Sequence, residues 1–151
     1  MSNQVPNSLK TMLWKGQIAA ETDVFKMILM DVGFDFDKDS HCAYTDVSAY
    51  ELPTGNGYTT GGITLTLSAV TTDDTEDRCE VSFDNAQWTA SGGSIATVGA
   101  IIYDDSTSTS NGDDYTDAVV AWMDANGTQT VADGAALTVS NILLTGADIS
   151  D

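Results

Sequence analysis

Residues 46–67, which read DVSAYELPTGNGYTTGGITLTL, decide how this 151-residue chain folds. The stretch begins as an acidic loop and then enters a glycine-rich turn with Gly55, Gly57, Gly61 and Gly62. Glycine adopts positive φ without steric cost, so these positions predict sharp changes of chain direction. From Ile63 to Ala69, apolar residues alternate with threonine and serine, which is the period of a half-buried β-strand.

The rest of the chain reads as further short strands separated by polar turns. Apolar or alternating runs predict strands at 24–30, 63–70, 80–83, 95–103, 118–124 and, as one strand or two, 135–144. We expect a turn or bulge at Asp84-Asn85, where the alternation changes phase. Asn126-Gly127 between strand-like runs predicts a hairpin turn. The polar run 104–114, DDSTSTSNGDD, has no apolar anchor and predicts a mobile exposed loop.

Residues 1–20 predict an amino-terminal arm with a short helix from Leu9 to Lys15. Ser8 can cap the start of this helix, and Gly16 can end it. A helix this short must pack on something, either its own sheet or a neighbouring subunit. With no helical run expected after residue 20, the pattern predicts one all-β domain spanning residues 1–151. Its fold would be an antiparallel β-sandwich or a jelly-roll-like barrel with a short N-terminal helix.

The charge is strongly acidic and unevenly distributed. Twenty-three acids and five bases give a net charge of −18, and four of the five bases lie in the first 40 residues. Such a surface repels phosphates, so we expect no nucleic-acid partner. Two interpretations remain: a solubilising surface, or a docked protein whose acidic body faces outward. The apolar run 24–30 is too short to span a membrane, and residues 1–20 lack the apolar core of a signal peptide, so we expect neither export nor a membrane partner.

Residues that could carry chemistry are few. His41 is the single histidine, and no GxSxG elbow, HExxH pair or phosphate loop is present. We therefore expect neither enzymatic activity nor a cofactor. Four carboxylates have the spacing of a calcium loop, although Ser40 stands where glycine is needed: Asp35, Asp37, Asp39 and Asp46. A solvated acidic loop is the simpler interpretation. Cys42 and Cys79 are expected to be reduced.

The aromatic residues separate into core and surface candidates. Trp88 and Trp122 lie in strand-like runs and are expected in the core, whereas Trp14 is expected at an interface. Tyr58 can bond either within its own domain or to a neighbour. The residues predicted to contact a partner are Leu9, Lys10, Leu13, Trp14, Lys15, Lys26 and Tyr58.

Three motifs of the chain carry a resemblance to a known group of proteins. They are residues 7–16, NSLKTMLWKG; residues 23–29, DVFKMIL; and residues 51–62, ELPTGNGYTTGG. In this order they resemble the small β-rich structural proteins of tailed-bacteriophage virions. The resemblance implies a non-enzymatic virion component, and we expect a capsid decoration (cement) protein. Such a protein is assembled in the host cytoplasm and lies on the outer surface of the capsid as a homo-oligomer.

The expected partners are the major capsid protein or other virion proteins. In this arrangement the N-terminal helix, with Lys10, Lys15 and Lys26, would approach the shell, and the loop 104–114 would form an outer tip. One alternative within the same class is a tail, adaptor or fibre-base protein. An alternative from another class is a carbohydrate- or calcium-binding adhesion module that uses exposed aromatics and the acidic loops.

Overall fold

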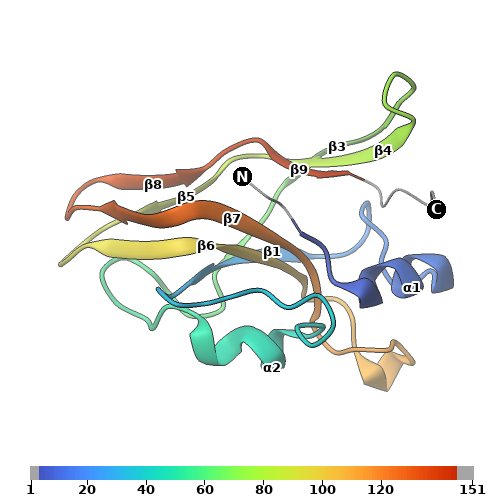
Figure 1. The fold of residues 1–151 in the computed structure, drawn as a ribbon, viewed down its shortest axis with the longest axis horizontal. Coiled ribbons are helices and arrows are strands. Elements are labelled where there is room, and N and C mark those ends of the chain that lie inside the picture. The colour runs from blue at the N-terminus through green and yellow to red at the C-terminus, as the bar shows by residue number, and fades with distance from the viewer. Residues whose placement is uncertain (1–3, 146–151) are drawn as a thin grey trace.

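Two layers of antiparallel β-sheet form the body of the protein in the computed structural model, which describes residues 4–145 (Figure 1). The first layer is a four-stranded sheet in the order β2-β1-β6-β7. The second layer holds a three-stranded sheet, β3-β4-β9, and a two-stranded sheet, β5-β8. The prediction of an all-β, sandwich-like fold is confirmed. The strands are β1 (Phe25–Met30), β2 (Ile63–Thr64), β3 (Leu67–Asp73), β4 (Arg78–Phe83), β5 (Ala86–Thr89), β6 (Ile95–Asp104), β7 (Ala118–Val131), β8 (Ala136–Val139) and β9 (Ile142–Thr145).

The central strands β1 and β6 are buried on both faces, because successive side chains of a strand point to opposite sides. Met27 and Ile102 point between the two layers, where they meet residues of the second layer such as Trp88. Ile28 and Trp122 point to the other face of the four-stranded sheet. Both tryptophans are buried, which confirms their predicted place in the core.

The loop from β1 to β2 covers that other face. Its Phe34, Phe36 and Val47 pack on the face that Ile28 and Trp122 line. This loop contains the helix α2 (Tyr44–Val47) and the 3-10 turn η1 (Ser48–Tyr50), so the expectation of no helix after residue 20 is wrong. The α2 helix has only four residues, too few to leave a helical period in the sequence.

The alternating run 63–70 is one pattern divided between two sheets. Ile63 pairs with Met27 in the first layer, whereas Leu67 pairs with Phe83 in the second. The single strand predicted here is therefore wrong, because the chain crosses between the layers around Leu65. The alternation persists through the crossing, since the interior lies on the same side of the chain before and after it. The phase change predicted at Asp84-Asn85 is confirmed, and it marks the passage from the three-stranded sheet to the two-stranded sheet of the second layer.

Asn126-Gly127 does not form the predicted hairpin turn. Both residues lie within β7, where Thr97 pairs with Gln129 but Gly99 pairs with Asp124, so β7 carries several extra residues at a bulge. The positive φ angles that Asn-Gly favours, 55° and 112°, bend the strand here and do not reverse it. The Asp124 carboxylate stabilises the bend by accepting a hydrogen bond from the Asn126 N–H at 2.7 Å.

The predicted N-terminal helix is present as α1 (Asn7–Lys15). Gly16 ends it with a φ of 69°, as expected. Ser8 does not cap it; Pro6 occupies the cap position, and the buried Ser8 hydroxyl has no hydrogen-bond partner among the described residues. Along the described part of the chain, no helix combines the length and the apolar character needed to cross a membrane.

Gly62 offers a test of the close packing at the glycine-rich turn. Its φ is +68°, and a Cβ atom there would lie 1.9 Å from the carbonyl oxygen of Met27. We expect Gly62→Ala to lower the free energy of unfolding by more than about 3 kcal/mol, because the β1 backbone would have to move. Gly61→Ala is the matched control: its φ is +92°, but its Cβ would meet open space. We expect a loss of about 1 kcal/mol there, measured by urea denaturation. Equal losses would show that the contact with Met27 is not the cause.

Candidate functional site

The glycine-rich motif turns inward and surrounds a buried carboxylate. Glu51 is 7% exposed and accepts hydrogen bonds from the Tyr44 hydroxyl at 2.6 Å, the Tyr58 hydroxyl at 2.6 Å and the Gly61 N–H at 2.7 Å. The Tyr58 hydroxyl in turn accepts a hydrogen bond from the Leu29 N–H. Burial, together with the hydrogen bonds to Glu51, raises the pKa of both tyrosines well above its usual value. The two tyrosine side chains are therefore neutral, and Tyr58 joins the network to the central strand β1.

This geometry gives the motif an internal role. Tyr58 is 2% exposed, so its ring has no surface to offer a partner. Of its two predicted roles, the bond within its own domain is the one that the structure contains. The close approach of Gly57 to the backbone of Thr89 in β5 and of Ser91 fits the same role, because a Cβ at Gly57 would lie 2.0 Å from the Thr89 carbonyl oxygen.

The candidate calcium carboxylates are used to build the 31–46 loop. Asp37 accepts hydrogen bonds from the Ser40 hydroxyl and the Asp39 N–H, which lower the pKa of its carboxyl group. Asp46 caps α2 by accepting from the N–H groups of Cys42 and Ala43. Asp39 accepts from the side chain of Asn7, and Asp35 is exposed. Within residues 4–145, no three His, Cys, Asp or Glu side chains are grouped so that they could hold a metal ion.

His41 also has a local structural role. The His41 Nδ1 accepts a hydrogen bond from the Asp37 N–H at 3.1 Å, and its ring stacks on Phe34 at 5.2 Å. Cys42 is buried, Cys79 is exposed, and both are free thiols, as expected.

A hollow of about 590 Å³ lies between the end of β4 and the start of β9. Asp84 is the single titratable group among the residues that line it. One carboxylate cannot supply an acid–base pair.

The exposed face of α1 is the surface that departs most from the acidic body. Leu9 points inward and is buried, whereas Trp14 is 76% exposed and Leu13 is 46% exposed. Lys10 lies four residues before Trp14 and therefore on the same helix face. Leu13 lies at the rim of an apolar cavity of about 80 Å³, which α1 shares with Phe83 and other residues of β1, β4 and β9. The helix thus presents an apolar, basic surface.

Lys15 and Lys26 are engaged within the chain. Lys15 pairs with Asp114 at 2.8 Å, and Lys26 pairs with Asp105 at 2.9 Å. The ion pair with Lys15 also lowers the pKa of Asp114. On α1, Lys10 is left as the one basic side chain without an ion pair to any of the described residues 4–145.

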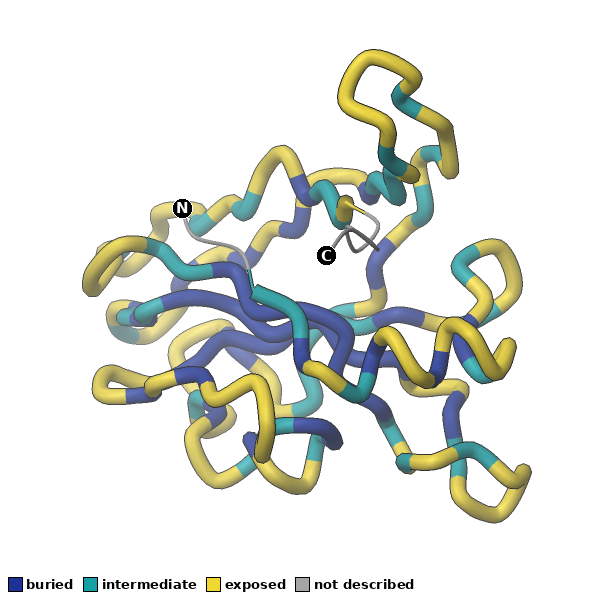
Figure 2. Tube along the Cα trace, turned by 45° about the vertical axis from the view of Figure 1, so that its right-hand side comes forward, coloured by how far each residue is buried: buried dark blue, intermediate teal, exposed yellow. Residues whose placement is uncertain are grey.

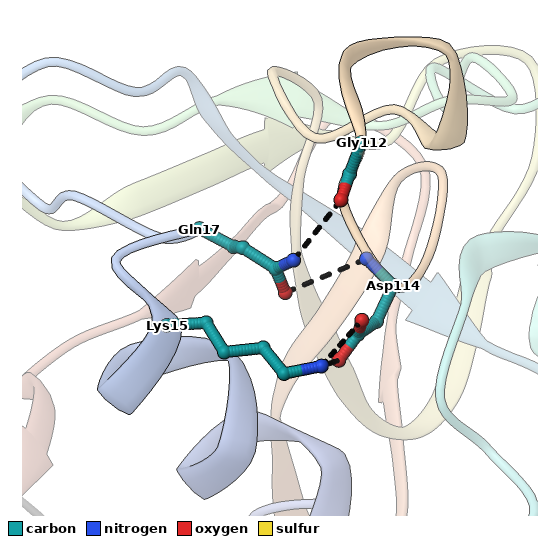
Figure 3. Close-up of polar contacts among 4 residues, drawn as sticks. All are labelled: Lys15, Gln17, Gly112 and Asp114. Atoms are coloured by element: carbon teal, nitrogen blue, oxygen red, sulfur yellow. Dashed lines mark hydrogen bonds and ion pairs between the residues drawn. The ribbon is translucent and has the colours of Figure 1, made fainter.

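The loop 104–114 is mostly exposed, as predicted, but polar contacts join it to the rest of the protein. Figure 3 shows how it is joined to the end of α1: besides Lys15–Asp114, the Gln17 side chain donates to the Gly112 carbonyl and accepts from the Asp114 N–H. Thr107 is buried, and its hydroxyl donates a hydrogen bond to the Asp104 carbonyl. A polar residue therefore takes the place that an apolar anchor would have. The loop and the helix lie side by side, so they cannot mark opposite ends of the protein.

A second unusual surface is the β3–β4 hairpin (residues 67–83), which projects from the body (Figures 1 and 2). It holds five acids and one base, a net charge of −5 + 1 = −4. Val70 pairs with Val81 and Thr72 pairs with Cys79, so these four residues share one side of the hairpin. Val81 packs against the core, but Val70 is 41% exposed. The side of the hairpin that packs on the core at Val81 is therefore exposed to solvent farther along, at Val70.

Comparisons of this chain with protein-family models, with curated proteins and with solved structures found no match. The candidate site therefore rests on its own geometry: the exposed face of α1 and the β3–β4 hairpin, at the same end of the molecule (Figure 1).

Asp104 is a buried acid that the sequence pattern did not single out. It ends β6 and is fully buried; one carboxylate oxygen accepts from the Ser106 N–H, and the other has no hydrogen-bond partner among the described residues. Burial, reinforced by the charge of Asp23, raises the pKa of this carboxyl group from 3.8 to about 7. Between these values the folded protein binds more protons than the unfolded chain, so stability falls as the pH rises.

We expect Asp104→Asn to remove this pH dependence. Above pH 7 the variant should be more stable than the parent by about 2 kcal/mol, because no buried charge forms. Urea denaturation between pH 5 and pH 9 measures both effects. Asp84→Asn, at an exposed position, is the control and should keep the parent's slope. An Asp104→Asn variant with an unchanged slope would contradict the assignment.

Proposed function

We propose that this chain is a non-enzymatic structural protein of a tailed-bacteriophage particle and that it decorates the outside of the head shell. The observation that carries the proposal is the exposed basic and apolar face of α1, with Lys10 and Trp14, on an otherwise acidic body. Tryptophan is enriched at protein interfaces relative to the rest of the surface, and it is one of the residues that most often dominate binding energy there. The three sequence motifs that resemble virion proteins add support.

Decoration requires binding energy and no catalysis. A subunit that binds only the mature shell stabilises that state by the free energy of binding. Several copies joined to one another bind more tightly than single copies, because each contact raises the effective concentration for the next. A rigid β-sandwich with one docking end and an acidic, soluble body suits this task.

The alternatives have less support. A calcium-dependent adhesion module would need free carboxylates in the 31–46 loop, but Asp37 and Asp46 are hydrogen-bonded to their own loop. A carbohydrate-binding surface would use exposed aromatics, and Trp14 and Tyr50, which are 76% and 50% exposed, lie on different elements, α1 and η1. A tail, adaptor or fibre-base protein could use the same docking end. The position of the protein in the particle distinguishes this alternative from decoration.

High-resolution imaging of the intact particle that carries this protein tests the proposal. We expect density that fits residues 4–145 as repeated oligomers on the outer surface of the head. The acidic body should face solvent, away from the packaged DNA. Density confined to the tail or the neck would support the tail or adaptor alternative and contradict decoration. Absence of the chain from purified particles would contradict a virion role.

A further inference from the structure

We propose that the exposed face of α1 in one copy of this chain docks on the β3–β4 hairpin of a second copy. The inference deepens the proposed function and rests on its assignment of α1 as a docking element, because it names the subunit that α1 contacts. It follows from three observations: the charges of the two elements, their uncovered apolar residues and their common place at one end of the molecule.

The charges of the two elements are opposite. Residues 7–15 of α1 hold two bases and no acid, whereas the β3–β4 hairpin has a net charge of −4. In a chain with a net charge of −18, α1 is thus an exceptional basic segment. Lys10 has no ion pair among the described residues, and the exposed hairpin-tip residues Asp74 and Asp77 have none either. A second copy brings each of these groups an opposite charge.

The apolar residues of the two elements are also complementary. Trp14 offers a large ring, and burying such a ring removes roughly 150–250 Å² of surface from water. The hairpin offers Val70 and the neighbouring Thr72 and Cys79, which lie on its core-facing side beyond the reach of the four-stranded sheet. Val81 joins this strip to the core. A helix seated there would extend the packing of the sandwich.

A contact within one copy does not satisfy these groups. Leu9 and Met12 hold α1 against its own sheet, and the face with Lys10 and Trp14 lies opposite to them. Trp14 therefore points away from its own body. The hairpin and α1 lie on two sides of the same end of the molecule (Figure 1). Around a rotation axis beside that end, each copy would give α1 to one neighbour and its hairpin to the other, which closes a ring and directs the acidic bodies outward.

Sedimentation velocity of the full chain over a concentration series tests this contact. We expect a closed oligomer whose association is weakened about 30-fold by Trp14→Ala, the size of effect seen at interface hot spots. Lys10→Glu should weaken it, as should the double change Asp74→Lys with Asp77→Lys. Combining Lys10→Glu with the two hairpin changes in one chain should restore association, because opposite charges face each other again. Val32→Ala and Lys38→Glu, at exposed positions outside both elements, are matched controls and should change nothing.

Mixing two variants sharpens the test. A chain with Lys10→Glu keeps a native hairpin, and a chain with Asp74→Lys and Asp77→Lys keeps a native α1. Their mixture should associate more strongly than either variant alone, because both contacts between the two chains, the native one and the charge-swapped one, then join opposite charges. Circular dichroism of each variant verifies the fold. A native chain that stays monomeric at all concentrations, or an oligomer unaffected by Trp14→Ala, overturns the inference.

This test is separable from that of the proposed function. A monomeric chain that imaging nevertheless finds on the head through its α1 face would overturn the contact between copies and keep decoration. An oligomer held by α1 and the hairpin but absent from phage particles would do the reverse.

Discussion

The buried carboxylate of Glu51 is the constraint on which much of this structure depends. A carboxylate removed from water must have its oxygens bonded, and here the donors come from three separate places in the segment 44–61. Glu51 itself lies beside Met30 of the central strand β1. One side chain therefore fixes a long connection against the middle of the four-stranded sheet.

The same network joins the two halves of the core. Tyr44 stacks on Tyr103 with ring centroids 4.9 Å apart, on the face that the loop covers. Tyr58 lies 6.3 Å from Trp88, on the face between the two layers. Because both hydroxyls bond to Glu51, packing on one side of the sheet is coupled to packing on the other. The close approach of Gly62 to Met27 then leads the chain into β2.

The sequence predicted the strands and the buried side chains better than it predicted their partners. The alternation from Ile63 to Ala69 indicated which side chains point inward, but the period of a strand carries no information on which sheet it joins. Asn126-Gly127 predicted a hairpin turn, but the positive φ angles that this pair favours serve a bulge equally well. Glu51 stood within a recognised motif, yet its burial depends on two tyrosines whose hydroxyls meet only in the folded chain. The exposure of Trp14 was predicted, whereas the internal ion pairs of Lys15 and Lys26 depend on loop placement that no local pattern encodes.

The chain thus contains an internal scaffold, residues 44–62, and the docking end that we propose for α1 and the β3–β4 hairpin. The most direct test of this division is to measure the free energy of unfolding and the self-association of Glu51→Gln together. We expect Glu51→Gln to lower the free energy of unfolding by about 2–4 kcal/mol, because a charged acceptor of buried donors is removed. We also expect unchanged association of the molecules that remain folded. A variant with parental stability but altered association would contradict the internal role of Glu51, since Glu51 would then act at the surface.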